Sequence, residues 1–252
     1  MLEEVIERMM LSVLQQPSVW IAFIVGMYMI TAWFLKFQKE LNIRFWTAVV
    51  LAISHVAIGV TAMKLLAIVE AGGNLEKAAN FRLFGAVFVL PLFYYSWAKI
   101  AKKNIPLVMD IAVLNCIFGM ITGRINCLVS GCCEGTVLFP GSDIRWPLRE
   151  IELVYSVVMI IFWGRKILKK QTYGQAYPAF MLSYGILRFL MEWVRDEYTG
   201  SLGMFHLAHI WSLISIVVGA GIYYKLRKDK QNSKINRKKV YSQSLTKGGN
   251  GK

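Results

Sequence analysis

The chain has 252 residues, of which 56% are hydrophobic and only 17% are charged, whereas soluble domains carry about 45–50% apolar and about 25% charged residues. This composition excludes a cytosolic globule, a disulfide-stapled secreted module and a disordered chain, and it predicts an all-α polytopic membrane protein. The net charge of +14 therefore has to be interpreted by position, because basic loops orient membrane chains.

About seven apolar stretches approach the roughly 20 residues that a helix needs to cross a bilayer. We predict transmembrane helices at about 18–35, 45–68, 83–98, 106–123, 152–164, 176–193 and 205–224. Residues 1–224 would thus form a single transmembrane domain. Residues 1–15 repeat apolar positions at helical spacing and are predicted to be an amphipathic surface helix, and 124–151 is predicted to be an outer loop or cap.

Basic residues are distributed unevenly over the predicted loops. Most of the 29 Lys and Arg residues follow the first, third and fifth predicted helices or lie in the tail after the seventh. The positive-inside rule then puts the C-terminus in the cytoplasm and the N-terminus outside. Residues 225–252 are basic and polar, and we predict a disordered cytoplasmic tail that lies on anionic lipid.

Charged residues inside apolar helices are costly and therefore point to function. Arg188 and Glu192 are four residues apart in the sixth predicted helix, and Tyr184 and Arg195 continue the same helical face. Arg124 stands at the outer end of the fourth predicted helix. Further polar residues expected at this depth are Glu152, His206, His209, Arg145 and Arg149.

Two interpretations of this polar set remain open. The residues could be an ion-pair network that only fixes helix packing. Alternatively, the arginines form an outer-leaflet site for an anionic head group, because a guanidinium binds phosphate oxygens bidentately and stays charged when it is desolvated. The surrounding apolar helices would then hold acyl chains.

The four cysteines do not predict a metal site, because Cys127, Cys132 and Cys133 form a C-x4-C-C pattern without the paired C-x2-C spacing of zinc sites. We expect small packing residues in a Gly-rich turn, or a disulfide from Cys127 to one of the adjacent pair, since this loop is predicted to face outward. No cofactor and no nucleic-acid partner are expected.

Motifs between residues 80 and 220 resemble, in order and spacing, the signatures of the bacterial prolipoprotein diacylglyceryl transferases. Residues 123–135 read GRINCLVSGCCEG, where the family has G-R-x-x-N-F-x-N-G-x-x-x-G. Residues 184–195 read YGILRFLMEWVR and are similar to its Y-G-x-x-R-x-x-x-E-x-x-R segment. Three further family motifs are matched by Asp110, by Pro147 with Glu152, and by residues 207–213.

The resemblance implies a multi-pass enzyme of the bacterial inner membrane that works without a cofactor. It would transfer the diacylglyceryl group of phosphatidylglycerol to the cysteine thiol of a lipobox-containing prolipoprotein, with membrane lipids as its surroundings. By the same resemblance, the catalytic residues would be Arg124 and Arg188, which hold the departing phosphate, with Glu192 and His209. The substrate-binding residues would be Gly131, Gly135, Glu152, Tyr184, Arg195 and Cys127.

The chain departs from the family pattern where a base would be expected. In place of two histidines, two asparagines and a glutamine, this chain has Phe84, Trp146, Cys127, Ser130 and His209. The acceptor thiol could ionise with help from the arginines alone, or its proton could pass to His206, His209, Glu152 or Glu192. A further alternative is a diverged paralogue that modifies a different acceptor or only binds phospholipid.

Overall fold

The computed structural model describes residues 17–74, 81–172, 174–195, 201–202 and 205–248. The predicted surface helix at 1–15 lies outside these residues. The described helices are α2 Pro17–Lys36, α3 Gln38–Leu41, α4 Phe45–Glu70, α5 Leu83–Ile100, α6 Ile105–Ser130, α7 Leu148–Leu168, α8 Ala176–Met191, the 3-10 turn η1 Glu192–Val194, and α9 Leu207–Gly248. One antiparallel pair of two-residue strands, β1 Ser201–Leu202 and β2 Phe205–His206, precedes α9.

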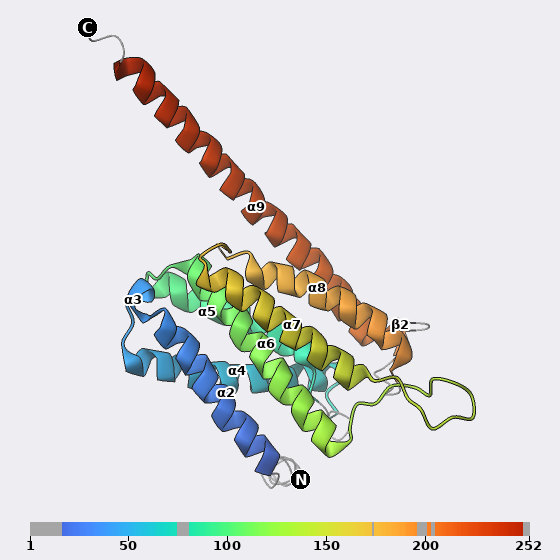
Figure 1. Ribbon diagram of the computed structural model, residues 1–252. Helices are drawn as coiled ribbons and strands as arrows, with labels where there is room; N and C mark the ends of the chain where they lie inside the picture. Colours follow the sequence, from blue (N-terminus) through green and yellow to red (C-terminus); the bar gives the residue numbers. More distant parts are fainter. Residues whose placement is uncertain (1–16, 75–80, 173, 196–200, 203–204, 249–252) are drawn as a thin grey trace.

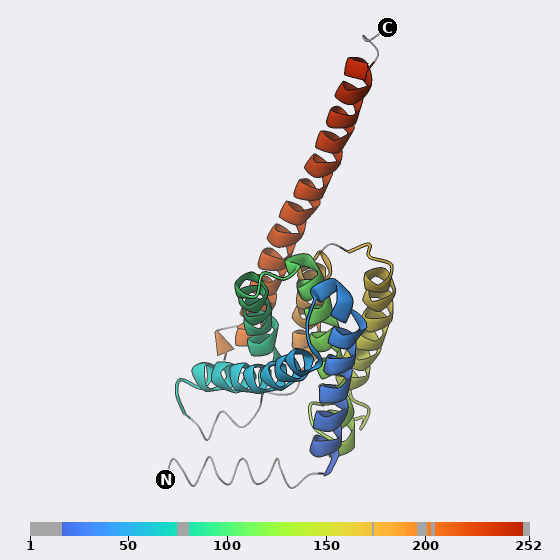
Figure 2. The same ribbon diagram turned by 90° about the vertical axis from the view of Figure 1, so that its left-hand side faces the viewer.

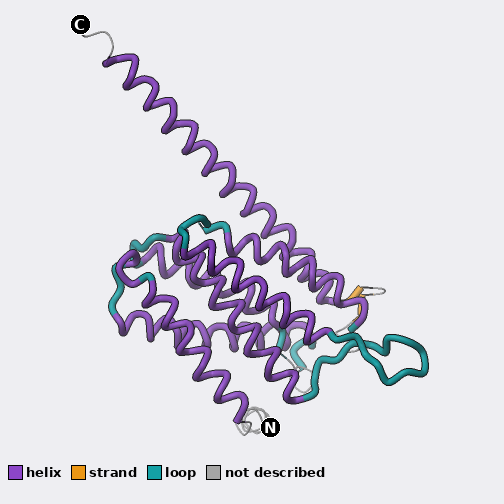
Figure 3. The backbone as a smooth tube through the Cα atoms, viewed as in Figure 1, coloured by secondary structure: helices purple, strands orange, loops and turns teal. Residues whose placement is uncertain are grey.

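Helix α6 lies in the middle of the bundle and contacts α2, α5, α7 and α8 (Figure 1). The tube in Figure 3 shows that short loops join most helices, while one longer loop connects α6 to α7. Helix α4 runs across the bundle rather than along it (Figure 2). Residues 110–117 of α6 are all buried, and all of them except Asp110 and Asn115 are apolar, as expected for a helix that neighbours surround on all sides.

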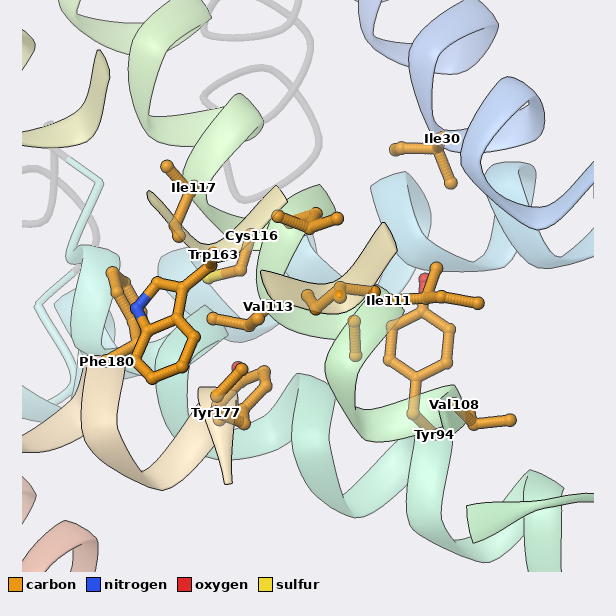
Figure 4. Close-up of a cluster of buried hydrophobic side chains, with 14 of the residues drawn as sticks. Ile30, Tyr94, Val108, Ile111, Val113, Cys116, Ile117, Trp163, Tyr177 and Phe180 are labelled. Carbon is orange, nitrogen blue, oxygen red and sulfur yellow. The ribbon is translucent and has the colours of Figure 1, made fainter. Parts of the chain in front are cut away.

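The core consists of aliphatic and aromatic side chains from the helices around α6. Figure 4 shows Ile30 of α2, Tyr94 of α5, Trp163 of α7 and Phe180 of α8 around the α6 side chains. Tyr177 carries its hydroxyl into this core and donates it to the Val87 carbonyl at 3.2 Å. The buried hydroxyl is therefore satisfied, which avoids the cost of an unpaired polar group.

Asp110 lies near the beginning of α6, at the end of this helix that we predict to be cytoplasmic, and connects it to the segment before α8. Its buried carboxylate accepts hydrogen bonds from the Thr172 hydroxyl and from the backbone N–H of Gly174 at 2.9 Å and of Ala176 at 3.3 Å. These contacts give Asp110 a structural role at the beginning of α8.

Four described helical segments are long and apolar enough to cross a membrane, namely α4, α5, α6 and residues Leu207–Asn232 of α9. Their outer surfaces are apolar as well, with exposed side chains such as Trp46, Leu92 and Val217. A water-soluble protein rarely exposes so much apolar surface. The chain is therefore an all-helical membrane protein, as its composition predicts.

Two predicted boundaries differ from the structure. Helix α6 continues past residue 123 to Ser130, and Gly131 ends it in the left-handed conformation with φ 69°. The reason is that residues 124–130 contain no helix breaker, so the loop before α7 begins at Gly131 rather than at residue 124. Helix α9 continues through 225–248, where we predicted a disordered tail, because Lys, Arg and Gln are good helix formers and no proline interrupts them.

Candidate active site

Glu152 of α7 joins two arginines from separate helices. Its side chain is 1% exposed and forms ion pairs with Arg124 of α6 and with Arg188 of α8. The Arg188 Nη1 atom lies 3.1 Å from Oε1 of Glu152. The two guanidinium groups that the sequence predicts at one depth of the membrane thus meet at a single carboxylate.

Glu192 provides a second buried carboxylate to the same cluster. Its Oε2 atom lies 3.2 Å from Arg188 Nη2 and 3.6 Å from Arg195 Nε, and its Oε1 atom lies 3.6 Å from His206 Nδ1. We call Arg124, Glu152, Arg188, Glu192 and Arg195 the arginine–glutamate network. Among its described members, three guanidinium groups face two carboxylates, which leaves one positive charge.

A cavity of about 520 Å³ lies beside this network. The three arginines of the network line its wall, whereas Glu152 and Glu192 are not among its lining residues. The carboxylates therefore hold the guanidinium groups from behind. Most of the remaining wall is apolar and includes Ile30, Val60, Phe84, Leu90 and Met120. Such a chamber suits an amphiphile with an anionic head group.

The sequence places Arg188 and Glu192 on one helical face, but Arg195 reaches the network differently. Helix α8 ends at Met191, η1 follows, and Arg195 has an extended backbone with φ −88° and ψ 137°. The loop after α6 pairs with this segment through a bridge between Gly135 and Arg195. The Thr136 N–H also donates to the Val194 carbonyl at 2.9 Å.

Gly131 and Gly135 shape this loop, and neither lines the cavity. Gly131 ends α6 at positive φ, which glycine adopts without strain. A Cβ atom at Gly135 would lie 2.5 Å from Trp146 Cβ and 3.0 Å from the Val194 carbonyl oxygen. Only glycine therefore allows the loop to approach the segment that carries Arg195.

Tyr184, which the resemblance gives as a substrate-binding residue, lies in the cavity wall. Its ring stacks on Phe180 with centroids 5.6 Å apart and tilts against Phe84, also at 5.6 Å. Phe84 itself lines the cavity where the family pattern has a histidine. At this position the cavity wall therefore has a phenyl ring instead of an imidazole that could accept a proton.

His209 is not among the residues that line the cavity. It is buried, its Nδ1 atom accepts the His206 backbone N–H at 3.1 Å, and its ring packs against Trp193 at 4.9 Å. His206 in turn contacts Glu192. This arrangement connects His209 to the back of the network rather than to the cavity.

Several polar residues in the wall were not predicted as site residues. His55 lines the cavity and shares a hydrogen bond of 2.9 Å with the Tyr94 hydroxyl. Glu70 and Arg82, from the end of α4 and the start of α5, also line it and form an ion pair of 2.6 Å. Their only signal in the sequence was their position at the ends of apolar stretches, which is common for surface charges.

The loop arginines lie outside the cavity wall. Arg145 and Arg149 both pair with Glu134, at 3.5 and 3.3 Å, and Arg149 donates to the Cys132 carbonyl at 3.3 Å. They therefore brace the loop. Cys127 lies in the wall, where its sulfur is 3.8 Å from Arg124 Nη1.

Comparison with known proteins shows the family of the chain. The prolipoprotein diacylglyceryl transferase family matches residues 18–225, a range that contains the entire arginine–glutamate network. The chain belongs to this family. The resemblance predicted from the motifs is thereby confirmed, and the protein is a transferase of lipoprotein biosynthesis in a bacterial membrane.

Its relatives are similar at modest identity. A phosphatidylglycerol–prolipoprotein diacylglyceryl transferase of Dehalococcoides mccartyi is 24% identical over 233 residues, covering 83% of this chain and 89% of the relative. A protein of Clostridium tetani with the same name is 22% identical, covering 69% and 78% of the two chains. The phosphatidylglycerol–prolipoprotein diacylglyceryl transferase 2 of Clostridium perfringens is 25% identical, covering 63% of this chain and 67% of the relative. The chain is thus a divergent member of the family.

Proposed function

We propose that this chain transfers the diacylglyceryl group of phosphatidylglycerol to the cysteine thiol of a lipobox-containing prolipoprotein at the outer leaflet of the inner membrane. The observation that carries the proposal is the pair Arg124 and Arg188, which are held from behind by Glu152 and face an apolar cavity. Phosphatidylglycerol has one anionic phosphate, which matches the arginines of the cavity wall, and two acyl chains, which match its apolar remainder. The names of the relatives specify the same two substrates.

The reaction joins the thiolate sulfur to the glycerol carbon of the diacylglyceryl group and breaks the bond between that carbon and a phosphate oxygen. Glycerol phosphate leaves with the electron pair of this bond, and the thiol proton passes to solvent. Negative charge therefore grows on the phosphate. Arg124 and Arg188 are oriented before the reaction begins and stabilise this charge in a cavity that is mostly apolar.

We propose that the arginines themselves promote ionisation of the acceptor thiol. Glu152 and Glu192 each form ion pairs with two arginines and do not line the cavity, so we assign neither of them as the proton acceptor. His209 lies outside the cavity wall, so we assign to it, with Glu192, the positioning of the network. A positive wall favours the thiolate over the thiol, and the thiolate is the nucleophile.

We further propose that α2, α7 and α8 cross the membrane together with the four long apolar helices, with the N-terminus outside and the C-terminus in the cytoplasm. These three helices pack into the same bundle, and most basic residues follow α2, α5 and α7 or lie toward the end of α9. Green fluorescent protein fused to the C-terminus should fluoresce, because it folds in the cytoplasm. A fusion protein that is abundant in the membrane but does not fluoresce, because the Sec pathway has exported its C-terminus, would contradict this orientation.

Conservative replacement of the arginines tests the transfer function. Arg124→Lys and Arg188→Lys should each lower thioether formation about 10²–10³-fold, because lysine keeps the charge but loses bidentate contact with phosphate. Phosphatidylglycerol and a lipobox peptide are the substrates, and the product is measured by mass. Arg149→Lys is the matched control, because Arg149 braces the loop outside the cavity wall.

Wild-type turnover in both lysine variants would contradict the proposed site. A purified protein that binds phosphatidylglycerol but forms no thioether would instead favour the diverged phospholipid binder. Phe84 in place of the family histidine is the feature that would support that outcome.

A further inference from the structure

Three cysteine sulfurs lie together in the cavity wall, and the transfer reaction proposed above does not use them. Cys127 belongs to the last turn of α6, and Cys132 and Cys133 follow directly after Gly131. Their sulfur atoms all lie within 4.8 Å of one another, and those of Cys127 and Cys133 are 4.0 Å apart. All three residues line the cavity.

The backbone explains how a cysteine in the last turn of α6 and two cysteines in the loop after it come together. Gly131 ends α6 in the left-handed conformation, and the Cys132 N–H returns to the Cys127 carbonyl at 3.2 Å. Cys133 also has a positive φ of 62°, which is uncommon for a residue with a side chain. The turn thereby folds the adjacent pair back over the helix end that carries Cys127.

We propose that Cys127, Cys132 and Cys133 bind a thiophilic cation of the Cu⁺ class. Metal–sulfur bonds of about 2.3 Å place three sulfurs around one ion roughly 4 Å apart, and the separation of Cys127 and Cys133 is 4.0 Å. Structural Zn²⁺ sites almost always have four protein ligands, whereas the described cluster offers three. Thiolates are also the ligands that select Cu⁺. The spacing in the sequence did not indicate this site, because the turn and not a C-x2-C repeat brings the sulfurs together.

Occupancy of this site would act on the phosphate site, a consequence that rests on the proposed function. Arg124 Nη1 lies 3.8 Å from the Cys127 sulfur. Three thiolates with one monovalent cation carry a net negative charge, which attracts the Arg124 guanidinium and competes with the lipid phosphate. The cation should therefore inhibit diacylglyceryl transfer.

The binding test is a titration of the reduced, purified full-length protein with Cu⁺ in detergent, without oxygen, against a coloured Cu⁺ chelator. We expect one ion per chain. Cys132→Ser should weaken binding by more than about tenfold, since even changes outside the ligand shell weaken metal sites about 10–100-fold. Cys132 is exposed, so its replacement leaves the packing of the bundle intact. Cys116→Ser is the matched control, because Cys116 also lines the cavity but lies about three helical turns before Cys127 and is not part of the cluster, so Cu⁺ binding should stay unchanged.

Cu⁺ binding that Cys132→Ser leaves unchanged would overturn the proposal. A reduced protein that binds no Cu⁺, and whose Cys127 and Cys133 simply join in a disulfide in air, would overturn it too. The transfer assay keeps the two proposals distinguishable. A protein that binds one Cu⁺ through the three cysteines but never forms a thioether supports the cation site and contradicts the proposed function. Both proposals are supported if the active protein loses transfer activity when it is loaded with Cu⁺ and the Cys132→Ser variant loses less activity under the same conditions.

Discussion

Glu152 shows how one buried carboxylate organises the site. It is almost inaccessible, and it contacts guanidinium groups from α6 and α8. A buried ion pair adds little net stability, but removing one partner leaves an uncompensated charge in a medium of low dielectric. Glu152 is therefore essential for keeping Arg124 and Arg188 together at the cavity wall.

Glu152→Gln should lower the free energy of unfolding by about 3–5 kcal/mol, because it removes the charge that both arginines share. Thermal unfolding in detergent measures the change. Glu134→Gln is the control, since Glu134 pairs with two loop arginines while 42% exposed, and its loss should cost less than about 1 kcal/mol. Equal stability of the two variants would mean that Glu152 is not energetically coupled to the arginines.

At the scale of the elements, two glycines bring α8 and α9 into close contact. A Cβ atom at Gly185 of α8 would lie 2.9 Å from the Ser212 carbonyl oxygen, and one at Gly219 of α9 would lie 2.7 Å from the Pro178 carbonyl oxygen. Small residues at membrane helix interfaces allow such backbone approach. The same contact holds in place the helix that carries Arg188.

Gly219→Ala should destabilise the protein by about 1–3 kcal/mol, because the added methyl group meets the α8 backbone. Gly221→Ala is a close control in the same helix, since a Cβ atom there has no neighbour within 4 Å. This second change should be neutral or stabilising by up to about 1 kcal/mol through helix propensity. Thermal unfolding distinguishes them, and a reversed order would contradict the packing described for α8 and α9.

The loop after α6 acts as an element that holds Arg195. Gly135→Ala should push this loop away from Val194 and lower transfer activity about tenfold, as misplacement of a positioned group by about 1 Å costs up to 10²-fold. Val137→Ala, at an exposed position of the same loop, should leave the rate unchanged. Thioether formation measures both variants, and an unaffected Gly135→Ala enzyme would show that the loop contact does not matter for catalysis.

On the scale of the whole molecule, α9 extends beyond the bundle as a single helix (Figures 1 and 2). Among residues 225–232, whose side chains the structure describes, none lines the cavity. Deletion of residues 233–252 should therefore leave transfer within roughly twofold of the intact chain in a purified assay, because tolerance to truncation follows burial and contacts. A large loss of turnover by the shortened protein would assign the basic end a part in the reaction.

Much of this architecture follows from local rules that can be applied to the sequence. Apolar runs of bilayer length predict the membrane helices, and the spacing of four between Arg188 and Glu192 predicts their shared face, which the ion pair between them confirms. The motifs around Arg124 and Arg188 also predicted the family. These predictions succeed because helical periodicity and the cost of charge in lipid act within one segment.

The sequence by itself determined the membrane class, the family and the residue types of the site. Only the tertiary structure decided that Glu152 joins two arginines, that Arg195 enters from an extended segment, that His209 lies outside the cavity wall and that three sulfurs converge. Each of these depends on how separate helices are rotated and packed against one another and on where a helix ends. Those variables are set by contacts between segments far apart in the chain, which no local pattern encodes.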